Sequence, residues 1–170
     1  ALLLYHIRLL ELLASFASGT RSTNTVEARL QQLYPYHDIL IPLCDPTTLV
    51  VVRIPLARFF FNVCVNVEII IPGLATSDSM WDFLESICSE LDSSEHIIRE
   101  FRQVKSSRDD NVAGAKDYES GNSRRRMQQH YHLVYVFEAA LPIVGTFFRR
   151  YFEDLNDLDD FERAQHVIGS

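Results

Sequence analysis

The sequence predicts an all-α fold, organised as a fragment of an armadillo- or HEAT-like helical solenoid. Its 170 residues match one ordinary domain in length, so we expect residues 1–170 to form a single helical-repeat domain. Apolar residues recur at steps of three and four in several segments, which is the spacing of one helix face. The predicted helices follow one another with short connections, at two or three per ~40 residues, as in helical repeats.

The first predicted helix begins at Leu2 and is expected to end at Gly19, because glycine is typical of the position just after a helix. Its large apolar residues share one stripe, which we expect to face the core: Leu2, Tyr5, Leu9, Leu12 and Phe16. Further leucines widen this stripe, as expected of a helix that packs against two neighbours.

Two short helices are expected next, one at 25–33 and one that opens at Pro35. Asp45-Pro46 places a capping carboxylate directly before a proline, which predicts a helix start. The apolar run at 49–67 could form buried strands or a buried helix, because periodicity does not separate the two. Its length and the preceding cap favour a buried central helix, kinked near Pro55.

Pro72-Gly73 is expected to separate this run from two further helices, at 79–91 and from Asp92 onward. Residues 106–123 are polar and nearly free of large apolar side chains, which predicts a disordered loop. The last long helix is then expected to start near Arg124 and to kink at Pro142.

Charge and composition exclude several functional classes. The chain has 16 basic and 23 acidic residues and a net charge of −7, which disfavours nucleic-acid binding. The apolar segments 2–16 and 49–74 both contain charged residues, so we expect no membrane span. The chain opens partway through a predicted helix and lacks the pattern of a signal peptide, and we interpret it as a piece of a longer protein. Its three widely spaced cysteines suggest a reducing compartment.

The side chains that could carry chemistry do not form a known catalytic or metal-binding pattern. His130 and His132 are two residues apart and would point away from each other on a helix. The acidic tail 154–162 lacks the glycine of a calcium-binding loop, so we interpret it as a solvated face. We therefore expect a non-enzymatic protein with no cofactor and no metal. An enzyme site assembled from scattered residues such as His37, Asp38 and Cys64 is a weaker alternative.

One basic cluster is a candidate for contact with a partner. Arg124, Arg125 and Arg126 stand together at a predicted helix start, where positive charge opposes the helix dipole. This conflict favours contact with an acidic partner or a phosphate, and the alternative is a solvated loop edge.

An ordered series of segments resembles the large cytosolic region of inositol trisphosphate receptors. The series comprises Tyr5-His6-Ile7-Arg8-Leu9-Leu10-Glu11-Leu12-Leu13-Ala14, Leu33-Tyr34-Pro35-Tyr36-His37-Asp38-Ile39, Phe61-Asn62-Val63-Cys64, Thr76-Ser77-Asp78-Ser79-Met80-Trp81-Asp82-Phe83 and, more loosely, Ile143-Val144-Gly145-Thr146-Phe147-Phe148. Most matching positions are of the core type, and those singled out are Tyr5, Leu9, Glu11, Leu12, Asn62, Cys64, Met80, Trp81 and Phe83. Related ryanodine receptors share the same kind of helical repeat.

The resemblance implies a segment of a tetrameric intracellular calcium-release channel, on the cytosolic face of the endoplasmic reticulum or another calcium store. The segment would belong to the helical region between the ligand-binding domains and the pore, so no ligand-contacting residue is carried over. Its partners would be other domains of the same subunit and neighbouring subunits, and its function would be to couple ligand binding to gating. The alternative is a soluble helical-repeat scaffold that binds a partner protein and has no link to a channel.

Overall fold

Helices make up every regular element in the part of the chain that the structure describes, as the sequence predicts. The computed structural model describes residues 2–18, 24–108, 119–151 and 165. The elements are α1 (Leu2–Ala17), α2 (Asn24–Leu33), α3 (Tyr36–Cys44), α4 (Val50–Phe60), the π-helix η1 (Phe61–Val65), α5 (Asp78–Arg108), α6 (Glu119–Val134), the π-helix η2 (Tyr135–Ala140) and α7 (Leu141–Tyr151). Gly19 and the acidic tail 154–162 lie outside the described residues.

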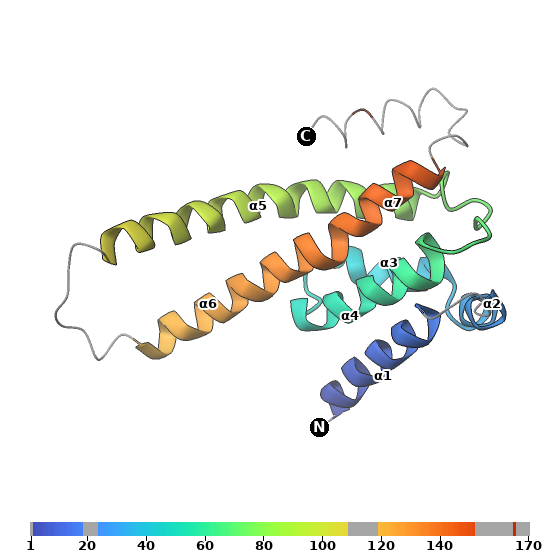
Figure 1. The fold of residues 1–170 in the computed structure, drawn as a ribbon, viewed down its shortest axis with the longest axis horizontal. Helices are drawn as coiled ribbons and strands as arrows, with labels where there is room; N and C mark the ends of the chain where they lie inside the picture. The colour runs from blue at the N-terminus through green and yellow to red at the C-terminus, as the bar shows by residue number, and fades with distance from the viewer. Residues whose placement is uncertain (1, 19–23, 109–118, 152–164, 166–170) are drawn as a thin grey trace.

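Helix α4 lies at the centre, as expected for the long apolar run. It contacts α1, α3, α6 and η2, and α3 also packs against α5 (Figure 1). The core is rich in large aromatic side chains with almost no exposed surface: Phe59, Phe60, Phe83, Trp81, Tyr135, Phe147 and Tyr151. Trp81 illustrates the packing, because its ring meets Phe147 edge-on with the centroids 6.0 Å apart and its indole N–H donates to the Ala75 carbonyl at 2.9 Å.

Helix α4 begins later than predicted. Its first residue is Val50, and Asp45 is instead the C-cap residue that directly follows α3. The Asp45 carboxylate accepts hydrogen bonds from the Thr47 backbone N–H at 2.8 Å and from the Thr47 hydroxyl at 2.7 Å. An Asp with this local bond stabilises a turn just as well as a helix start, so the prediction of a helix at Asp45-Pro46 is wrong.

Helix α5 runs through the point where the sequence suggested a break. Asp92-Ser93-Ser94 lies inside a single helix from Asp78 to Arg108. The Ser93 hydroxyl donates to the Ser89 carbonyl at 3.1 Å and the Ser94 hydroxyl donates to the Glu90 carbonyl at 2.8 Å. Serine in mid-helix often bonds back to the preceding turn in this way, and so these serines do not start a new helix.

The predicted loop at 106–123 is also shorter than expected. Helix α5 continues to Arg108 and α6 already begins at Glu119, so both ends of the predicted loop are helical. Residues 109–118 lie outside the described part of the chain. Helices α5 and α6 form a long antiparallel hairpin that extends well beyond the other helices (Figure 1). We call its outer part, residues 95–108 and 119–131, the arm.

Helix α1 buries a different face from the one predicted. Its buried positions are Ala14 and Ala17, with Leu10 half-buried on the same side. Tyr5, Leu12 and Phe16 are 62%, 52% and 60% exposed. Their large apolar side chains were expected in the core, whereas close packing of α1 on α4 uses the small alanines, which allow the two helices to approach.

Helices α6, η2 and α7 follow one another without a break, and Pro142 lies in the first turn of α7. Proline has no backbone N–H, so it cannot donate to the carbonyl four residues earlier, that of Glu138. The turn before it is widened into the π-helix η2, in which the Leu141 N–H reaches the Val136 carbonyl. Pro55 lies inside α4 in a similar way, and η1 follows that helix directly.

One helix among the described residues, 123–151, is long and apolar enough to cross a membrane. Several of its side chains are buried in the core of this fold, including Tyr135, Ile143 and Phe147. The central helix of a water-soluble core passes the same test of length and composition, so the absence of a membrane span stays a prediction.

Candidate functional site

A cluster of polar side chains is buried where α4, α5, α6 and η2 meet. Arg53 on α4 is only 4% exposed, and its guanidinium contacts the Glu90 carboxylate at 2.7 Å and the Tyr135 hydroxyl at 3.0 Å. The same guanidinium lies 4.2 Å from the centre of the Tyr135 ring, within the range of a cation–π contact. Together with Ser94 and His132, these residues form what we call the polar cluster.

His132 connects α6 to α5 in this cluster. Its Nδ1 is 3.2 Å from a Glu90 carboxylate oxygen, and its Nε2 is 3.1 Å from the Ser94 hydroxyl and 3.3 Å from the Glu90 carbonyl. The Ser94 proton already goes to the Glu90 carbonyl at 2.8 Å. These contacts join α6 to α5 through a single side chain.

Burial and charge shift the pKa values in the cluster. Burial disfavours the charged form of Arg53, but Tyr135 and Glu90 outweigh this effect and raise the pKa of Arg53 above its ordinary value. Burial raises the pKa of the Tyr135 phenol to about 12, although the positive charge of Arg53 acts in the opposite direction. The Arg53 Nε is buried without a hydrogen-bond partner. The buried charge of Arg53 is therefore stabilised by its contacts with Glu90 and Tyr135. These contacts connect α4, α5 and the continuous helix of α6 and η2.

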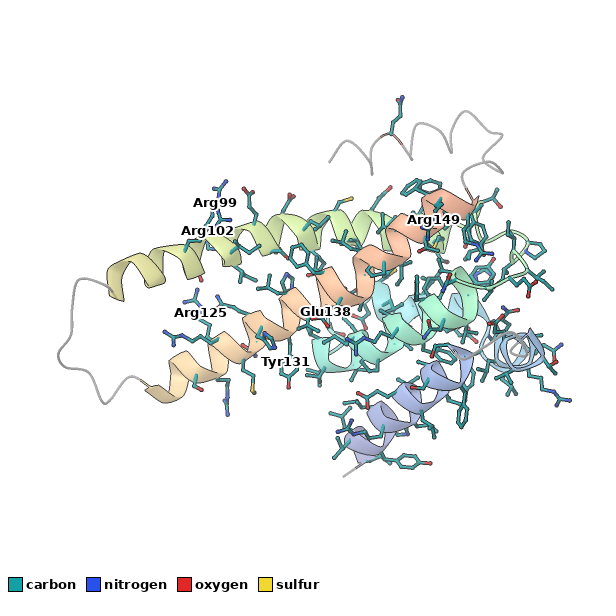
Figure 2. All side chains as sticks on the ribbon, in the orientation of Figure 1. Arg99, Arg102, Arg125, Tyr131, Glu138 and Arg149 are labelled. Atoms are coloured by element: carbon teal, nitrogen blue, oxygen red, sulfur yellow. The ribbon has the colours of Figure 1, made fainter. Side chains whose placement is uncertain are left out.

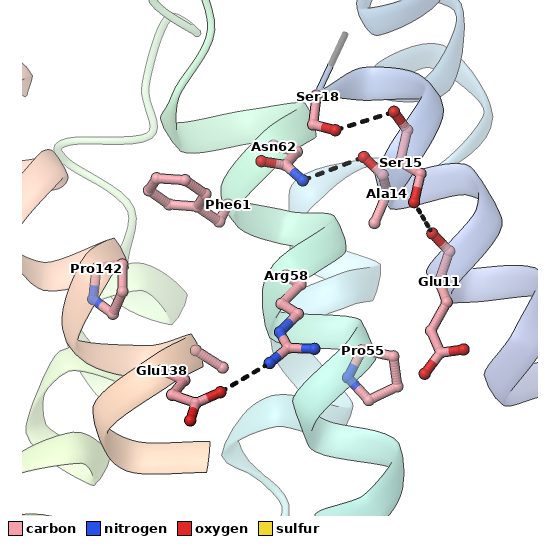
Figure 3. Close-up of a pocket in the computed structure, with 11 residues that line it drawn as sticks. Glu11, Ala14, Ser15, Ser18, Pro55, Arg58, Phe61, Asn62, Glu138 and Pro142 are labelled. Atoms are coloured by element: carbon pink, nitrogen blue, oxygen red, sulfur yellow. Dashed lines mark hydrogen bonds and ion pairs between the residues drawn. The ribbon is translucent and has the colours of Figure 1, made fainter. Parts of the chain in front are cut away.

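Two of the surface grooves formed by the described residues flank the core. The first, which we call the joint groove, has a volume of about 470 Å³ and is lined by residues of α1, α4, η1, η2 and α7. Arg58 and Glu138 form an exposed ion pair across it at 3.2 Å, and Asn62 donates to the Ala14 carbonyl at 3.1 Å (Figure 3). Two of the prolines that lie within helices, Pro55 and Pro142, line this groove.

The hydroxyl groups that line the joint groove belong to Ser15 and Ser18. Each donates to a backbone carbonyl of its own helix, at 2.8 Å to Glu11 and 2.9 Å to Ser15 (Figure 3). No histidine, cysteine or lysine is among the residues that line the groove. Both serine hydroxyls are engaged by backbone carbonyls of the α1 segment.

The second groove lies at the base of the arm, and we call it the arm groove. It has a volume of about 610 Å³. Three elements line it: the connection to α4 and its first turn (Pro46, Thr47, Thr48, Leu49, Val50 and Val51), helix α5 (Ser93 and Ile97) and helix α6 (Gln128, Gln129, Tyr131 and His132). His132 thus belongs both to the polar cluster and to the wall of this groove.

The residues singled out from the sequence fall into three environments. Cys64, Met80, Trp81 and Phe83 are fully buried, and Asn62 bonds to α1. Leu9 and Glu11 are half-buried, and Glu11 pairs with Arg8 at 2.7 Å. Tyr5 and Leu12 are exposed.

Arg124, Arg125 and Arg126 lie on the first described turns of α6. Arg125 pairs with Glu100 on α5 at 2.9 Å, and Glu100 also accepts a hydrogen bond from Gln129 at 2.9 Å. These bonds hold the two helices of the arm together. Arg124 has no ion pair with another described residue.

The scattered residues of the alternative enzyme site do not share one accessible surface. His37 is exposed on α3, with its ring centre 3.8 Å from that of Tyr36, and Asp38 is exposed beside it. Cys64 is fully buried in η1, and burial raises the pKa of its thiol to about 12. Among the described residues, no three His, Cys, Asp or Glu side chains are grouped closely enough to hold a metal ion.

Sequence reasoning missed the polar cluster. One signal was available, because Arg53 stands inside the longest apolar run, and a buried charge is normally paired. The partners Glu90 and Tyr135 are 37 and 82 residues away in sequence, and nothing local in the sequence identifies them.

The chain matches no family model, no curated protein and no solved structure in comparisons with known proteins. The resemblance to inositol trisphosphate receptors therefore stays a prediction from the residues quoted above. The fold defines the class, an all-helical domain with a long hairpin arm.

Proposed function

We propose that this chain is a coupling segment in the cytosolic helical region of a calcium-release channel of the inositol trisphosphate receptor type. In this function the segment carries no reaction and binds no cofactor. It passes movement between a ligand-binding region and a pore in the same homotetramer, at the cytosolic face of an intracellular calcium store. Its neighbours are other domains of its own subunit and adjoining subunits.

The exposed apolar face of α1 is the observation that carries this proposal. Leu12 and Phe16 lie on the side of α1 opposite its contact with α4 and are more than half exposed. A soluble domain rarely leaves several large apolar side chains of one helix in water. In a helical repeat each unit completes its packing against the next unit, so this face fits a neighbouring helical layer.

The joint groove supports the mechanical part of the proposal. Helix α1 meets α4 and η1 on one side of the groove, and α7 meets η1 and η2 on the other. Two prolines and two π-helices lie at this junction, and such irregular turns are where helices bend most readily. Rotation of α1 by a neighbouring layer would therefore be transmitted to α7 across the groove.

The first experiment is to sequence the parent transcript on both sides of this segment. A channel requires a group of apolar spans of ~20 residues toward the C-terminus and a basic ligand-binding region upstream. An open reading frame that contains neither would overturn the channel proposal and leave a soluble helical scaffold.

The second experiment tests coupling in the full-length channel with the double variant Leu12→Ser/Phe16→Ser. Both side chains are exposed, so each replacement should change the stability of the segment itself by less than about 0.5 kcal/mol. We expect binding of inositol trisphosphate to be retained and calcium release from store vesicles to fall severalfold. Ile41→Ser on α3, which is 66% exposed, is the matched control and should release calcium normally. Normal release by the double variant would contradict the role of the α1 face.

A further inference from the structure

The arm groove has the shape and chemistry of a docking site for a short peptide segment. Its lining combines apolar side chains, among them Leu49, Ile97 and Tyr131, with uncharged polar groups. Leu49 is 58% exposed and Tyr131 is 37% exposed. The groove's volume of about 610 Å³ lies in the usual range of ~300–1,000 Å³ for ligand pockets, which is enough for a few apolar side chains.

The arm above this groove is basic, in contrast to the chain as a whole. Described residues 95–102 and 123–126 contain five arginines and two glutamates, whereas the net charge of the chain is −7. Arg124 and Arg125 precede Gln128 and Gln129 by four residues, so they lie on the same face of α6 as these two lining residues. Figure 2 shows Arg99 and Arg102 on α5 and Arg125 on α6 along the outer part of the hairpin.

Two acidic side chains beside the groove are already engaged. Glu100 pairs with Arg125 at 2.9 Å and accepts a hydrogen bond from the lining residue Gln129 at 2.9 Å. Asp45 adjoins the lining residue Pro46, and its carboxylate accepts both bonds from Thr47. The positive charge of the arm therefore dominates one end of the groove. A ligand that fits this site has apolar side chains for the groove and carboxylates for the arm.

The sequence of this chain contains a segment with that chemistry. Residues 154–162, which lie outside the described part of the structure, read Asp-Leu-Asn-Asp-Leu-Asp-Asp-Phe-Glu. Their apolar side chains, Leu155, Leu158 and Phe161, recur every third residue, and carboxylates fill most positions between them. A step of three places such side chains on one side of a helical turn.

We propose that the arm groove of one copy of this chain binds the segment 154–162 of a second copy. The leucine and phenylalanine side chains occupy the groove, and the carboxylates meet Arg124 and Arg125. Arg124 has no ion pair with another described residue, and Arg125 exchanges its contact with Glu100 for the incoming carboxylate. The two copies associate through a basic groove and an acidic segment, so the contact is sensitive to salt.

Distance favours a second copy over the segment of the same chain. Tyr131 in the groove and Tyr151 are 20 residues apart on one continuous helix, which is a span of about 30 Å at 1.5 Å per residue. Four residues from Tyr151 to Leu155 cover at most about 14 Å, even when fully extended. Leu155 therefore cannot enter the groove of its own chain. Phe161, ten residues from Tyr151, could span about 33–36 Å, so the three apolar side chains cannot all occupy the groove of their own chain.

Fluorescence anisotropy of a labelled synthetic peptide, residues 153–163, titrated with the full chain, tests this proposal. We expect saturable binding that weakens when the salt concentration is raised from about 50 mM to about 500 mM. Reversal of charge in Arg124→Glu/Arg125→Glu should weaken binding about tenfold, since it replaces two exposed attractions with two repulsions. A peptide carrying Asp157→Arg and Asp159→Arg should bind this variant better than it binds the original chain.

Matched controls separate the groove from general charge. The variant Arg8→Glu/Arg149→Glu makes the same change of charge on α1 and α7 and should bind the original peptide normally. A peptide with serine in place of Leu155, Leu158 and Phe161 should lose binding. Absence of saturable binding, or equal loss in both charge-reversed variants, would overturn the proposal.

Sedimentation velocity of the full chain tests whether the contact joins two copies. We expect a concentration-dependent dimer that the Arg124→Glu/Arg125→Glu variant loses and that the Arg8→Glu/Arg149→Glu variant keeps. Circular dichroism verifies that both variants are folded. A chain that stays monomeric at concentrations well above the peptide's dissociation constant would overturn assembly between copies. This test uses the isolated chain and does not depend on whether the parent is a channel.

Discussion

Glu90 is the residue whose loss should most clearly reveal the energetics of the buried cluster. Its carboxylate contacts Arg53 at 2.7 Å and His132 at 3.2 Å, and its side chain is 22% exposed. The variant Glu90→Ala removes the counter-charge of Arg53, which stays buried beside the Tyr135 hydroxyl and ring. We therefore expect a larger loss of stability than a surface ion pair would give.

The expected loss is about 3 kcal/mol. Removal of one partner from a buried ion pair typically costs ~3–5 kcal/mol, and the lower end applies because Glu90 is partly reached by water. The free energy of unfolding of a whole domain is only about 5–15 kcal/mol, so this is a large fraction. For a chain of this length it corresponds to a fall in Tm of about 6–12 °C.

Urea and thermal unfolding followed by circular dichroism measure this effect. Two control variants show whether the loss of stability comes from the buried ion pair. Glu95→Ala removes the partner of Arg99 in an exposed pair and should cost less than about 0.5 kcal/mol. The double variant Arg53→Met/Glu90→Ala removes the stranded cation as well, and it should be more stable than Glu90→Ala alone. A cost below about 1 kcal/mol for Glu90→Ala would refute the assignment of this pair as buried and energetically coupled.

Two further predictions concern the core. Trp81→Ala should cost about 3–5 kcal/mol in urea unfolding, because the indole is fully buried against Phe147 and its N–H bond to Ala75 is lost; a cost under 1 kcal/mol would contradict a core position. Burial raises the pKa of Cys64 from 9.0 to about 12, so the unfolded chain loses this proton at lower pH than the folded chain. Stability should therefore be complete below about pH 9 and should fall as the pH rises toward 12, and unchanged urea midpoints at about pH 8 and about pH 10 would contradict this. At neutral pH, a thiol reagent should label Cys64 only after urea is added.

The helical class could be predicted from sequence because it depends on periodicity, which is local. The orientation of α1 could not. Large apolar residues define the more obvious stripe on this helix, but the face that packs on α4 is built from Ala14 and Ala17. Small residues give a weak hydrophobic signal even when they form the closest helix contact. The strong stripe identifies a face that the other described residues leave exposed.

The predicted helix boundaries were wrong where one residue type is common in two kinds of local structure. Asp45 bonds to Thr47 in a turn, although the same carboxylate before a proline is also typical of a helix start. Ser93 and Ser94 bond back along α5, although serine equally caps a new helix. Only packing decides between these alternatives, because the local hydrogen bonds are of similar strength in both.

The polar cluster was beyond prediction for a different reason. Arg53 could be recognised as a charge in an apolar run, but its partners come from α5 and η2, far away in sequence. Their meeting depends on how three helices cross. The arm groove is likewise formed by segments on α4, α5 and α6 that no motif connects.

The antiparallel course of α5 and α6 has a consequence for how this protein can change during evolution. The contact of Glu90 with His132 connects the two helices of the hairpin at the point where the hairpin leaves the core. Beyond that point, residues added to both helices in matching numbers of whole turns, at 3.6 residues per turn, would lengthen the arm without altering the core. An insertion in one helix alone would shift its face relative to the other and separate Glu100 from Arg125. The hairpin can therefore differ in length among descendants of one ancestor while the core stays constant, provided that its two sides change together.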